Sequence, residues 1–232
     1  MKALIFAAGL GERMRPLTNH TPKPLLEVGG KPLIVWHLER LAALGVDEVV
    51  INTSWLAECF PPALGDGARW GLKLVYSYEG AEPLETGGGM AKALAHLGDA
   101  PFIAVNGDVF CDADFSRLPR QPEGLAHLLL VDNPEHNPHG DFALRDDGRV
   151  DSDGEAKLTF SGIGVYRPEL LLRCRDRWQT PGEAHPRFKL APILRAAMAE
   201  GLVTGQRHDG VWMDIGTPQR LADLDAALIR AR

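Results

Sequence analysis

The sequence predicts an α/β fold built on a mixed, mostly parallel sheet flanked by helices. Residues 2–8 form an apolar run that ends in glycines, which is typical of a fully buried strand. Residues 31–44 then carry apolar side chains at helical spacing, and residues 48–53 are apolar and β-branched. Because strands joined through helices run parallel with right-handed crossovers, this alternation predicts a parallel sheet in the first half of the chain.

The remaining elements are predicted in chain order. A helix over residues 55–64 is expected to break at Pro61-Pro62, and a hairpin over residues 142–150 is expected to turn at Asp147-Gly148. No internal repeat, low-complexity tract or linker interrupts the chain, so we expect a single domain over residues 1–232. The other strands are expected over residues 73–78, 102–105, 125–131, 158–166, 203–206 and 211–213, and the other helices over residues 90–97, 169–177, 190–200 and 218–229.

The composition is that of an ordinary soluble globular protein. Hydrophobic residues make up 45% and charged residues 24% of the chain, and no apolar run approaches the length of a membrane span. A net charge of -6 argues against a nucleic-acid surface. Cys59, Cys111 and Cys174 are far apart and form neither a CxxC pair nor a disulfide framework. We therefore expect a reducing, cytoplasmic compartment, with the thiols as buried apolar filler.

The local charge near the N-terminus differs from the overall balance. Residues 1–31 contain five cationic side chains and two carboxylates, a balance of +3. This pattern favours a small anion bound at the first loop, although a solvated charged loop has the same composition. The cationic residues are Lys2, Arg13, Arg15, Lys23 and Lys31, and the carboxylates are Glu12 and Glu27.

A glycine-rich segment follows the first expected strand and has the composition of a phosphate-binding loop. Its glycines let backbone N–H groups approach phosphate oxygens, and its cationic side chains neutralise the phosphate charge. The dinucleotide-binding fingerprint is excluded because its third glycine is replaced by Met14, and the P-loop is excluded because no Gly-Lys-Ser/Thr run exists. An ordinary glycine-rich turn is the remaining alternative.

The same segment strongly resembles the signature of the sugar-1-phosphate nucleotidyltransferases, G-x-G-x-R-x-x-P-x-T-x-x-x-P-K. At roughly 5% usage per residue type, a match at every fixed position has a chance probability on the order of one in a billion per start. The resemblance therefore outweighs the reading as an ordinary turn. The seven fixed positions are filled by Gly9, Gly11, Arg13, Pro16, Thr18, Pro22 and Lys23.

The resemblance covers the whole chain. Later landmarks include Glu-Thr-Gly-Gly-Gly at residues 85–89, Asn-Gly-Asp at 106–108, Phe-Lys-Leu-Ala-Pro at 188–192 and Met-Asp-Ile-Gly-Thr-Pro at 213–218. Within the family this set is most similar to the bacterial uridylyltransferases that act on N-acetylmuramate α-1-phosphate in cell-wall recycling.

The resemblance implies a Rossmann-like sheet of the nucleotidyltransferase type, with residues 1–108 mainly binding the nucleotide and residues 109–232 mainly binding the sugar. It implies UTP and a sugar 1-phosphate as substrates, and a UDP-sugar and pyrophosphate as products. The chain ends soon after the core, without the left-handed β-helix of bifunctional relatives, which is compatible with a monomer.

Two aspartates are the candidate metal ligands. Asp108 follows an expected strand, where a doubly wound sheet places its ligands, and Asp214 ends another. Mg²⁺ is usually held by one or two carboxylates plus phosphate oxygens, and the resemblance supports this role over that of turn or helix-cap residues. His136 and His139 flank Asn-Pro in an expected loop, so a transition-metal site is disfavoured.

The resemblance also implies roles for residues around the two substrates. Arg13 and Lys23 are expected to act on the phosphates, without a covalent nucleophile, while a sugar phosphate oxygen attacks the α-phosphorus of UTP in line. Glu79 is the expected acceptor for the uracil N3–H, and a carboxylate there would repel cytosine, whereas a guanine N1–H remains compatible. The other nucleotide-binding candidates are Ala8, Gly9, Gly11, Glu85, Gly87 and Gly88, and the sugar-binding candidates are Asn106, Gly140, Asp141, Glu155, Gly162 and Lys189.

The sequence differs from the family pattern at one place and is also compatible with other functions. Many relatives carry Glu-Lys-Pro where this chain has Glu155-Ala156-Lys157, which leaves Lys157 in doubt as a phosphate ligand. Lys189 is the substitute candidate for that role, although an exposed lysine at the start of a helix is the alternative. Thymidylyl-, guanylyl- and choline-phosphate cytidylyltransferases share the class, and a non-catalytic nucleotide-binding regulatory subunit would share the fold. A nicotinamide-dependent oxidoreductase is disfavoured by Met14.

Overall fold

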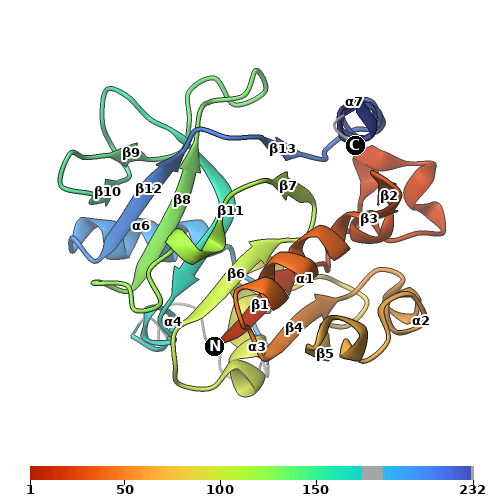
Figure 1. Ribbon diagram of the computed structural model, residues 1–232. Helices are drawn as coiled ribbons and strands as arrows, with labels where there is room; N and C mark the ends of the chain where they lie inside the picture. The colour runs from red at the N-terminus through yellow and green to blue at the C-terminus, as the bar shows by residue number, and fades with distance from the viewer. Residues whose placement is uncertain (174–184, 231–232) are drawn as a thin grey trace. The chain divides into compact units, whose positions relative to one another are not determined.

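The computed structural model describes residues 1–173 and 185–230 (Figure 1). It divides into two compact units that alternate along the chain. Unit 1 comprises Met1–Pro83, Val105–Phe115 and Val211–Arg232, and unit 2 comprises Leu84–Ala104 and Ser116–Gly210. Neither unit coincides with residues 1–108 or 109–232, so the assignment of one substrate to each of those parts stays a prediction.

Three strands of unit 1 form the predicted parallel sheet. Strand β1 (Lys2–Phe6) pairs with β4 (Glu48–Thr53), which pairs with β5 (Lys73–Tyr78), and both pairs are parallel. The apolar and β-branched runs that predicted β1 and β4 are buried almost throughout, as expected for strands covered on both faces. Unit 1 also contains β2 (Glu27–Val28), β3 (Lys31–Pro32), β7 (Val109–Cys111), β13 (Trp212–Asp214), α1 (Leu33–Ala43), α2 (Phe60–Leu64) and α7 (Pro218–Arg230).

The two helices near the start of the chain have different bounds from those predicted. Helix α1 begins after Pro32, because Lys31–Pro32 pairs with Glu27–Val28 as a short antiparallel ladder. The prolines expected to break the second helix instead lie at its first positions, where a missing N–H costs no hydrogen bond. A 3₁₀ turn over Ala57–Cys59 precedes that helix.

A buried apolar cluster joins the glycine-rich loop to the C-terminal helix of unit 1. Met14, in the loop, is 1% exposed and packs in the same cluster as Leu224 of α7. Asp225 of α7 also accepts a hydrogen bond of 2.7 Å from the N–H of Gly29. Figure 1 shows α7 beside β2, in agreement with these contacts. The other buried members of the cluster are Leu26, Val28, Leu33, Phe110 and Ile215.

Unit 2 contains the antiparallel pair that makes the fold mixed. Strand β8 (Ala126–Val131) is antiparallel to β11 (Thr159–Tyr166) and parallel to β12 (Val203–His208). The predicted hairpin is confirmed as β9 (Ala143–Leu144) and β10 (Val150–Asp151). The mixed, mostly parallel sheet flanked by helices is therefore confirmed. Strand β6 (Phe102–Asn106) runs from unit 2 into unit 1, and the helices of unit 2 are α3 (Glu85–Leu97), α4 (Glu169–Leu172) and α6 (Leu190–Ala199).

Some predicted features fall beyond the described residues. The helix expected over residues 169–177 is described only as far as α4, and Cys174 lies outside the described residues. Within residues 1–173 and 185–230, no helix combines the length and apolar character needed to cross a membrane.

Candidate active site

Two fixed positions of the glycine-rich signature contact each other and close the loop after β1. The hydroxyl of Thr18 donates to the carbonyl of Gly11 at 2.7 Å, and Thr18 is fully buried. Gly11 has φ +64°, and a Cβ there would lie 2.9 Å from Cγ2 of Thr18, so only glycine fits. The loop then turns through Glu12–Met14 and leaves the side chain of Arg13 exposed while that of Met14 is buried.

A chain of side-chain hydrogen bonds connects this loop to Glu79. The Ala7 N–H donates to Oδ1 of Asn52 at 2.6 Å, and Nδ2 of Asn52 donates to Oε1 of Glu79 at 2.6 Å. Glu79 is 8% exposed, so its carboxylate is held in a defined orientation. Sequence analysis missed Asn52, although an amide within the otherwise apolar run of β4 was a signal. Ala8 is buried, and a Cβ on Gly9 would meet no atom within 4 Å, so the backbone at Gly9 borders open space.

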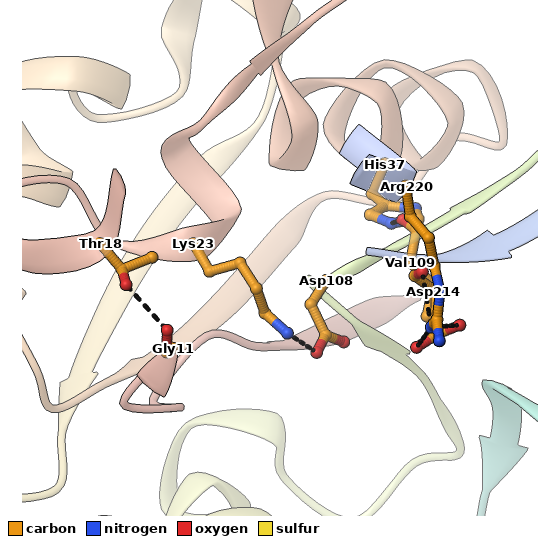
Figure 2. Close-up of polar contacts among 8 residues, drawn as sticks. All are labelled: Gly11, Thr18, Lys23, His37, Asp108, Val109, Asp214 and Arg220. Atoms are coloured by element: carbon orange, nitrogen blue, oxygen red, sulfur yellow. Dashed lines mark hydrogen bonds and ion pairs between the residues drawn. The ribbon is translucent and has the colours of Figure 1, made fainter. Parts of the chain in front are cut away.

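Asp108 lies directly after β6, as predicted, and contacts Lys23. The Lys23 ammonium and Oδ2 of Asp108 are 2.5 Å apart, and the Lys23 side chain is only 11% exposed (Figure 2). Gly107 fixes this position, because its N–H donates to the Phe6 carbonyl at 2.8 Å and a Cβ there would lie 2.7 Å from that oxygen. Asn106, the last residue of β6, is partly exposed.

The two candidate metal ligands come from neighbouring segments. Strands β7 and β13 pair antiparallel with Asp214 opposite Val109, and the Ile215 N–H donates to the Asp108 carbonyl at 2.8 Å. Within residues 1–173 and 185–230, no cluster of three or more His, Cys, Asp or Glu side chains could hold a metal ion. A pair of carboxylates fits a hard divalent ion whose remaining ligands are water and substrate phosphate oxygens, and does not fit a transition-metal site.

Arg220 is a site residue that sequence analysis missed. Its Nη1 lies 2.6 Å from both carboxylate oxygens of Asp214, as Figure 2 shows. A Cβ on Gly216 would lie 2.9 Å from Oδ2 of Asp214, 3.1 Å from Nη1 of Arg220 and 3.4 Å from Nη1 of Arg13. Both guanidinium groups therefore flank the Asp214 carboxylate, and Gly216 leaves room for them. An arginine in the first turn of the helix after Gly-Thr-Pro was the available signal.

His37, a third missed residue, supports the strand next to Asp108. It is fully buried on α1, and its Nε2 donates to the Val109 carbonyl at 2.7 Å (Figure 2). Burial lowers the pKa of His37 to about 4, so the imidazole is neutral near pH 7. Since Nε2 carries the proton, Nδ1 is an acceptor, and it has no hydrogen-bond partner among the described residues. The helical apolar spacing around His37 hid this role, because it predicts a core position.

Unit 2 brings two of the later landmarks together. The N–H groups of Gly87 and Gly88, at the start of α3, both donate to the Phe188 carbonyl at 3.0 Å. A Cβ on Gly87 would lie 2.5 Å from the Phe188 ring, and the Leu190 N–H donates to Oγ1 of Thr86. The Glu-Thr-Gly-Gly-Gly and Phe-Lys-Leu-Ala-Pro segments thus cap and pack against each other. The helix expected to begin at residue 90 therefore begins at Glu85, and residues 85–88 lie inside α3.

Glu85 and Lys189 lie at the two ends of this capping arrangement. Glu85 adopts φ +64°, a left-handed conformation that is uncommon for a residue with a side chain, and its carboxylate contacts Arg187 at 3.3 Å. Lys189 directly precedes α6 and is exposed. Both side chains are therefore at the surface of the capping segment rather than within it.

The remaining sugar-binding candidates lie around the bulge in β11. Oδ2 of Asp141 accepts a hydrogen bond of 2.8 Å from the Phe160 N–H, where the register shifts between Phe160 and Ile163. Gly162 lies in this bulge with φ +79°, and Gly140, with φ +63°, packs against the Lys157 backbone. Glu155 is exposed. One carboxylate oxygen of Asp141 thus supports the bulge that shapes this part of unit 2.

The fold and the unit 1 site define a class of protein: an enzyme that handles phosphate groups, with cations on a glycine-rich loop beside paired carboxylates. The chain belongs to the nucleotidyl transferase family, whose model matches residues 2–230. Members of this family transfer a nucleotidyl group to a sugar 1-phosphate and generally use a divalent metal ion.

Individual relatives agree with this assignment. The chain is 51% identical to an N-acetylmuramate alpha-1-phosphate uridylyltransferase of Neisseria meningitidis, over 97% of each chain. It is 35% identical to an enzyme of the same name from Caulobacter vibrioides, over 99% of this chain and 97% of the relative. A solved structure of a putative glucose-1-phosphate thymidylyltransferase from Bacillus anthracis, in complex with a sucrose, matches 98% of this chain with a TM-score of 0.84 at 20% identity and shows the same fold.

Proposed function

We propose that this nucleotidyltransferase transfers UMP from UTP to N-acetylmuramic acid α-1-phosphate and releases pyrophosphate. The observation that carries the reaction is the contact of Lys23 with Asp108 beside Asp214, since it gathers the predicted cations and carboxylates at one place in unit 1. The choice of substrates is supported by the names of the two relatives with 51% and 35% identity.

The nucleotide is assigned to the signature loop and to Glu79. Glu79 is oriented by Asn52, and its carboxylate accepts the N3–H of uracil while it disfavours cytosine, whose N3 is an acceptor. The N–H groups of Gly87 and Gly88 already donate to Phe188, so we assign the uracil carbonyls to the backbone of Ala8 and Gly9 instead. Gly11 keeps the loop closed around the phosphates.

Arg13 and Lys23 supply the charge stabilisation of the transfer. A phosphate oxygen of the sugar 1-phosphate attacks the α-phosphorus of UTP in line, and the bond to the β-phosphate oxygen breaks as pyrophosphate leaves. Lys23 neutralises the negative charge on the α-phosphate oxygens, and Arg13 stabilises the charge that develops on pyrophosphate. When bound by Asp108 and Asp214, a divalent ion, for which we propose Mg²⁺, neutralises further phosphate oxygens.

Unit 2 is assigned to the sugar. N-acetylmuramic acid carries a lactyl ether whose carboxylate needs a cation or a neutral donor. Arg145 contacts Asp151, Lys157 donates to the Ser152 carbonyl, and Arg187 contacts Glu85, whereas no carboxylate of the described residues pairs with Lys189. We therefore assign the lactyl carboxylate to Lys189. The other sugar contacts in unit 2 are proposed for Gly140, Asp141, Glu155 and Gly162, and a further contact is proposed for Asn106, which belongs to unit 1.

A panel of four nucleoside triphosphates and three sugar 1-phosphates, monitored by pyrophosphate release, tests the proposal. We expect the highest kcat/KM with UTP and N-acetylmuramic acid α-1-phosphate. An equal or higher kcat/KM with N-acetylglucosamine 1-phosphate would contradict the sugar assignment, and the same result with another nucleotide would contradict the assignment of UTP.

We also propose a cytoplasmic location for the reaction. The described cysteines, Cys59 and Cys111, are free thiols, which fits a reducing compartment. Cys111 is buried as expected, whereas Cys59 is only partly buried. Thiol labelling of the protein in freshly opened cells tests this, and we expect an accessible reduced Cys59.

A further inference from the structure

Each carboxylate of the proposed metal site is already paired with a cation of the chain. Lys23 lies 2.5 Å from Asp108, and Nη1 of Arg220 lies 2.6 Å from both oxygens of Asp214. The side chains of Lys23 and Arg220 are 11% and 25% exposed, and those of Asp108 and Asp214 are 37% and 22% exposed, so both pairs are partly shielded from solvent. Ion pairs that are shielded in this way are stronger than those on an open surface, so both cations must be displaced or shared before the carboxylates bind a metal.

The local charge makes binding of a metal alone unfavourable. Arg13, Lys23 and Arg220 contribute three positive charges, and Asp108 and Asp214 contribute two negative charges, so the cluster has a net charge of +1. A divalent cation added to this cluster meets net repulsion. A nucleoside triphosphate brings several negative charges and reverses that balance.

The position of Arg220 allows it to change partner. Its Nη1 and that of Arg13 both lie within 3.4 Å of the point where a Cβ on Gly216 would be, next to Oδ2 of Asp214. A phosphate oxygen near this point would meet two guanidinium groups, which bind phosphate well. Gly216 is therefore needed because a side chain at this position would crowd both guanidinium groups and the Asp214 carboxylate.

We propose that Lys23 and Arg220 are resident counter-ions that keep a divalent metal off Asp108 and Asp214 until substrate phosphates arrive. The cations then exchange their carboxylate partners for phosphate oxygens, and the carboxylates become ligands of the metal. This inference rests on the proposed function and adds to it a role for Arg220 and a coupling between metal and nucleotide binding. No covalent step is involved.

A purely structural role for these ion pairs predicts the opposite change in metal affinity when the cation is removed. If Arg220 only fastened α7 to β13, its removal would loosen Asp214 and weaken metal binding. If Arg220 is a competing counter-ion, its removal frees Asp214 and strengthens metal binding. The same contrast applies to Lys23 and Asp108.

Binding of Mn²⁺ to the nucleotide-free full chain, followed by electron paramagnetic resonance, separates these cases. We expect Lys23→Met and Arg220→Met each to bind Mn²⁺ about tenfold more tightly than the parent chain, from the loss of one positive charge within a few ångströms of the ion. Matched controls are Lys73→Met, whose ammonium pairs with Glu48 at the other end of the strands, and Arg230→Met, at the far end of α7. Both controls should bind Mn²⁺ as the parent does.

The reciprocal experiment measures binding of metal-free UTP by calorimetry in the presence of a chelator. Asp108→Asn and Asp214→Asn each release a cation and raise the net charge, so we expect UTP to bind about fivefold more tightly to both. Circular dichroism and thermal unfolding verify that every variant is folded. Unchanged or weaker binding in the Mn²⁺ and UTP experiments would overturn the counter-ion role. If the two asparagine variants also kept catalytic activity, the metal assignment itself would fail, whereas their inactivity would leave the proposed function in place.

Discussion

Replacement of His37 tests whether its buried hydrogen bond to Val109 stabilises the strand next to Asp108. The imidazole is fully buried, donates to the Val109 carbonyl at 2.7 Å, and has a pKa lowered to about 4 by burial. His37→Leu removes the donor and leaves a buried carbonyl without a partner, which costs about 1–3 kcal/mol. His37→Gln keeps an N–H donor at a similar reach and is expected to retain part of that free energy.

The lowered pKa of His37 also predicts how the free energy of unfolding changes with pH. Its folded pKa of about 4 lies below the ordinary histidine pKa of about 6.5, so the unfolded chain takes up the proton first as the pH falls. The stability contributed by neutral His37 is therefore present above pH 6.5 and is lost between pH 6.5 and 4. The loss amounts to about 2 kcal/mol by pH 5 and about 3 kcal/mol by pH 4.

Urea unfolding of the parent chain and of His37→Gln at pH 7.5, 6 and 5 measures this effect, because other titrating groups cancel in the difference. We expect the parent to be the more stable protein at pH 7.5 and its advantage to shrink by about 2 kcal/mol at pH 5. His37→Leu should show the same shift from a lower starting stability. A difference between parent and variant that does not change with pH would refute the neutral, buried imidazole and the role given to its hydrogen bond.

The remaining predictions concern the reaction. Asp108→Asn and Asp214→Asn are expected to abolish metal-dependent pyrophosphate release while circular dichroism shows a folded chain, and near-parental turnover at saturating Mg²⁺ would contradict the ligand assignment. Lys23→Ala and Arg13→Ala are expected to lower kcat by on the order of a hundred- to a thousandfold with a smaller effect on the KM for UTP, since their charges act on the transition state. Lys189→Ala is expected to raise the KM for N-acetylmuramic acid α-1-phosphate about tenfold and to leave that for N-acetylglucosamine 1-phosphate unchanged, because only the former carries the lactyl carboxylate. Equal effects on both sugars in steady-state kinetics would contradict the role of Lys189.

The parts of the fold that could be predicted from sequence are those determined by local pattern. Residues 73–78 are rich in apolar and aromatic side chains and lie between Gly71 and Gly80, and β5 has those bounds. Asp147-Gly148 predicted the β9–β10 hairpin because glycine accepts the positive φ of +80° found at Gly148. In both cases the information lies within a few residues of the element itself.

The start of α3 could not be predicted in the same way. Three consecutive glycines favour a turn, but the first N–H groups of this helix are satisfied by the carbonyl of Phe188, about a hundred residues further along the chain. Gly87 and Gly88 are needed because the Phe188 ring and the Pro186 carbonyl lie against them. Local propensity was overridden by a tertiary contact that no short window contains.

The candidate site also contains some residues that the sequence predicts and others that only the structure identifies. Arg13, Lys23, Asp108 and Asp214 belong to landmarks of the family, so a sequence can nominate them. Of these, the structure brings Lys23 onto Asp108 and places Asp214 opposite Val109. Asn52 and His37 act through hydrogen bonds to residues that lie far away in sequence, whereas Arg220, at the start of the next helix, pairs with the nearby Asp214. Their roles emerge only once their partners are known.

The signature loop therefore combines two kinds of residue that a pattern match does not separate. Gly11 and Thr18 contact each other, and Met14 packs against the C-terminal helix, so these residues build the loop and would be required for any ligand. Arg13 and Lys23 project from that frame and carry the charge. A protein that kept the frame and lost the charges would still match most of the pattern and would still fold. The contact between Lys23 and Asp108, which needs both segments at once, is accordingly stronger support for catalysis than the loop alone.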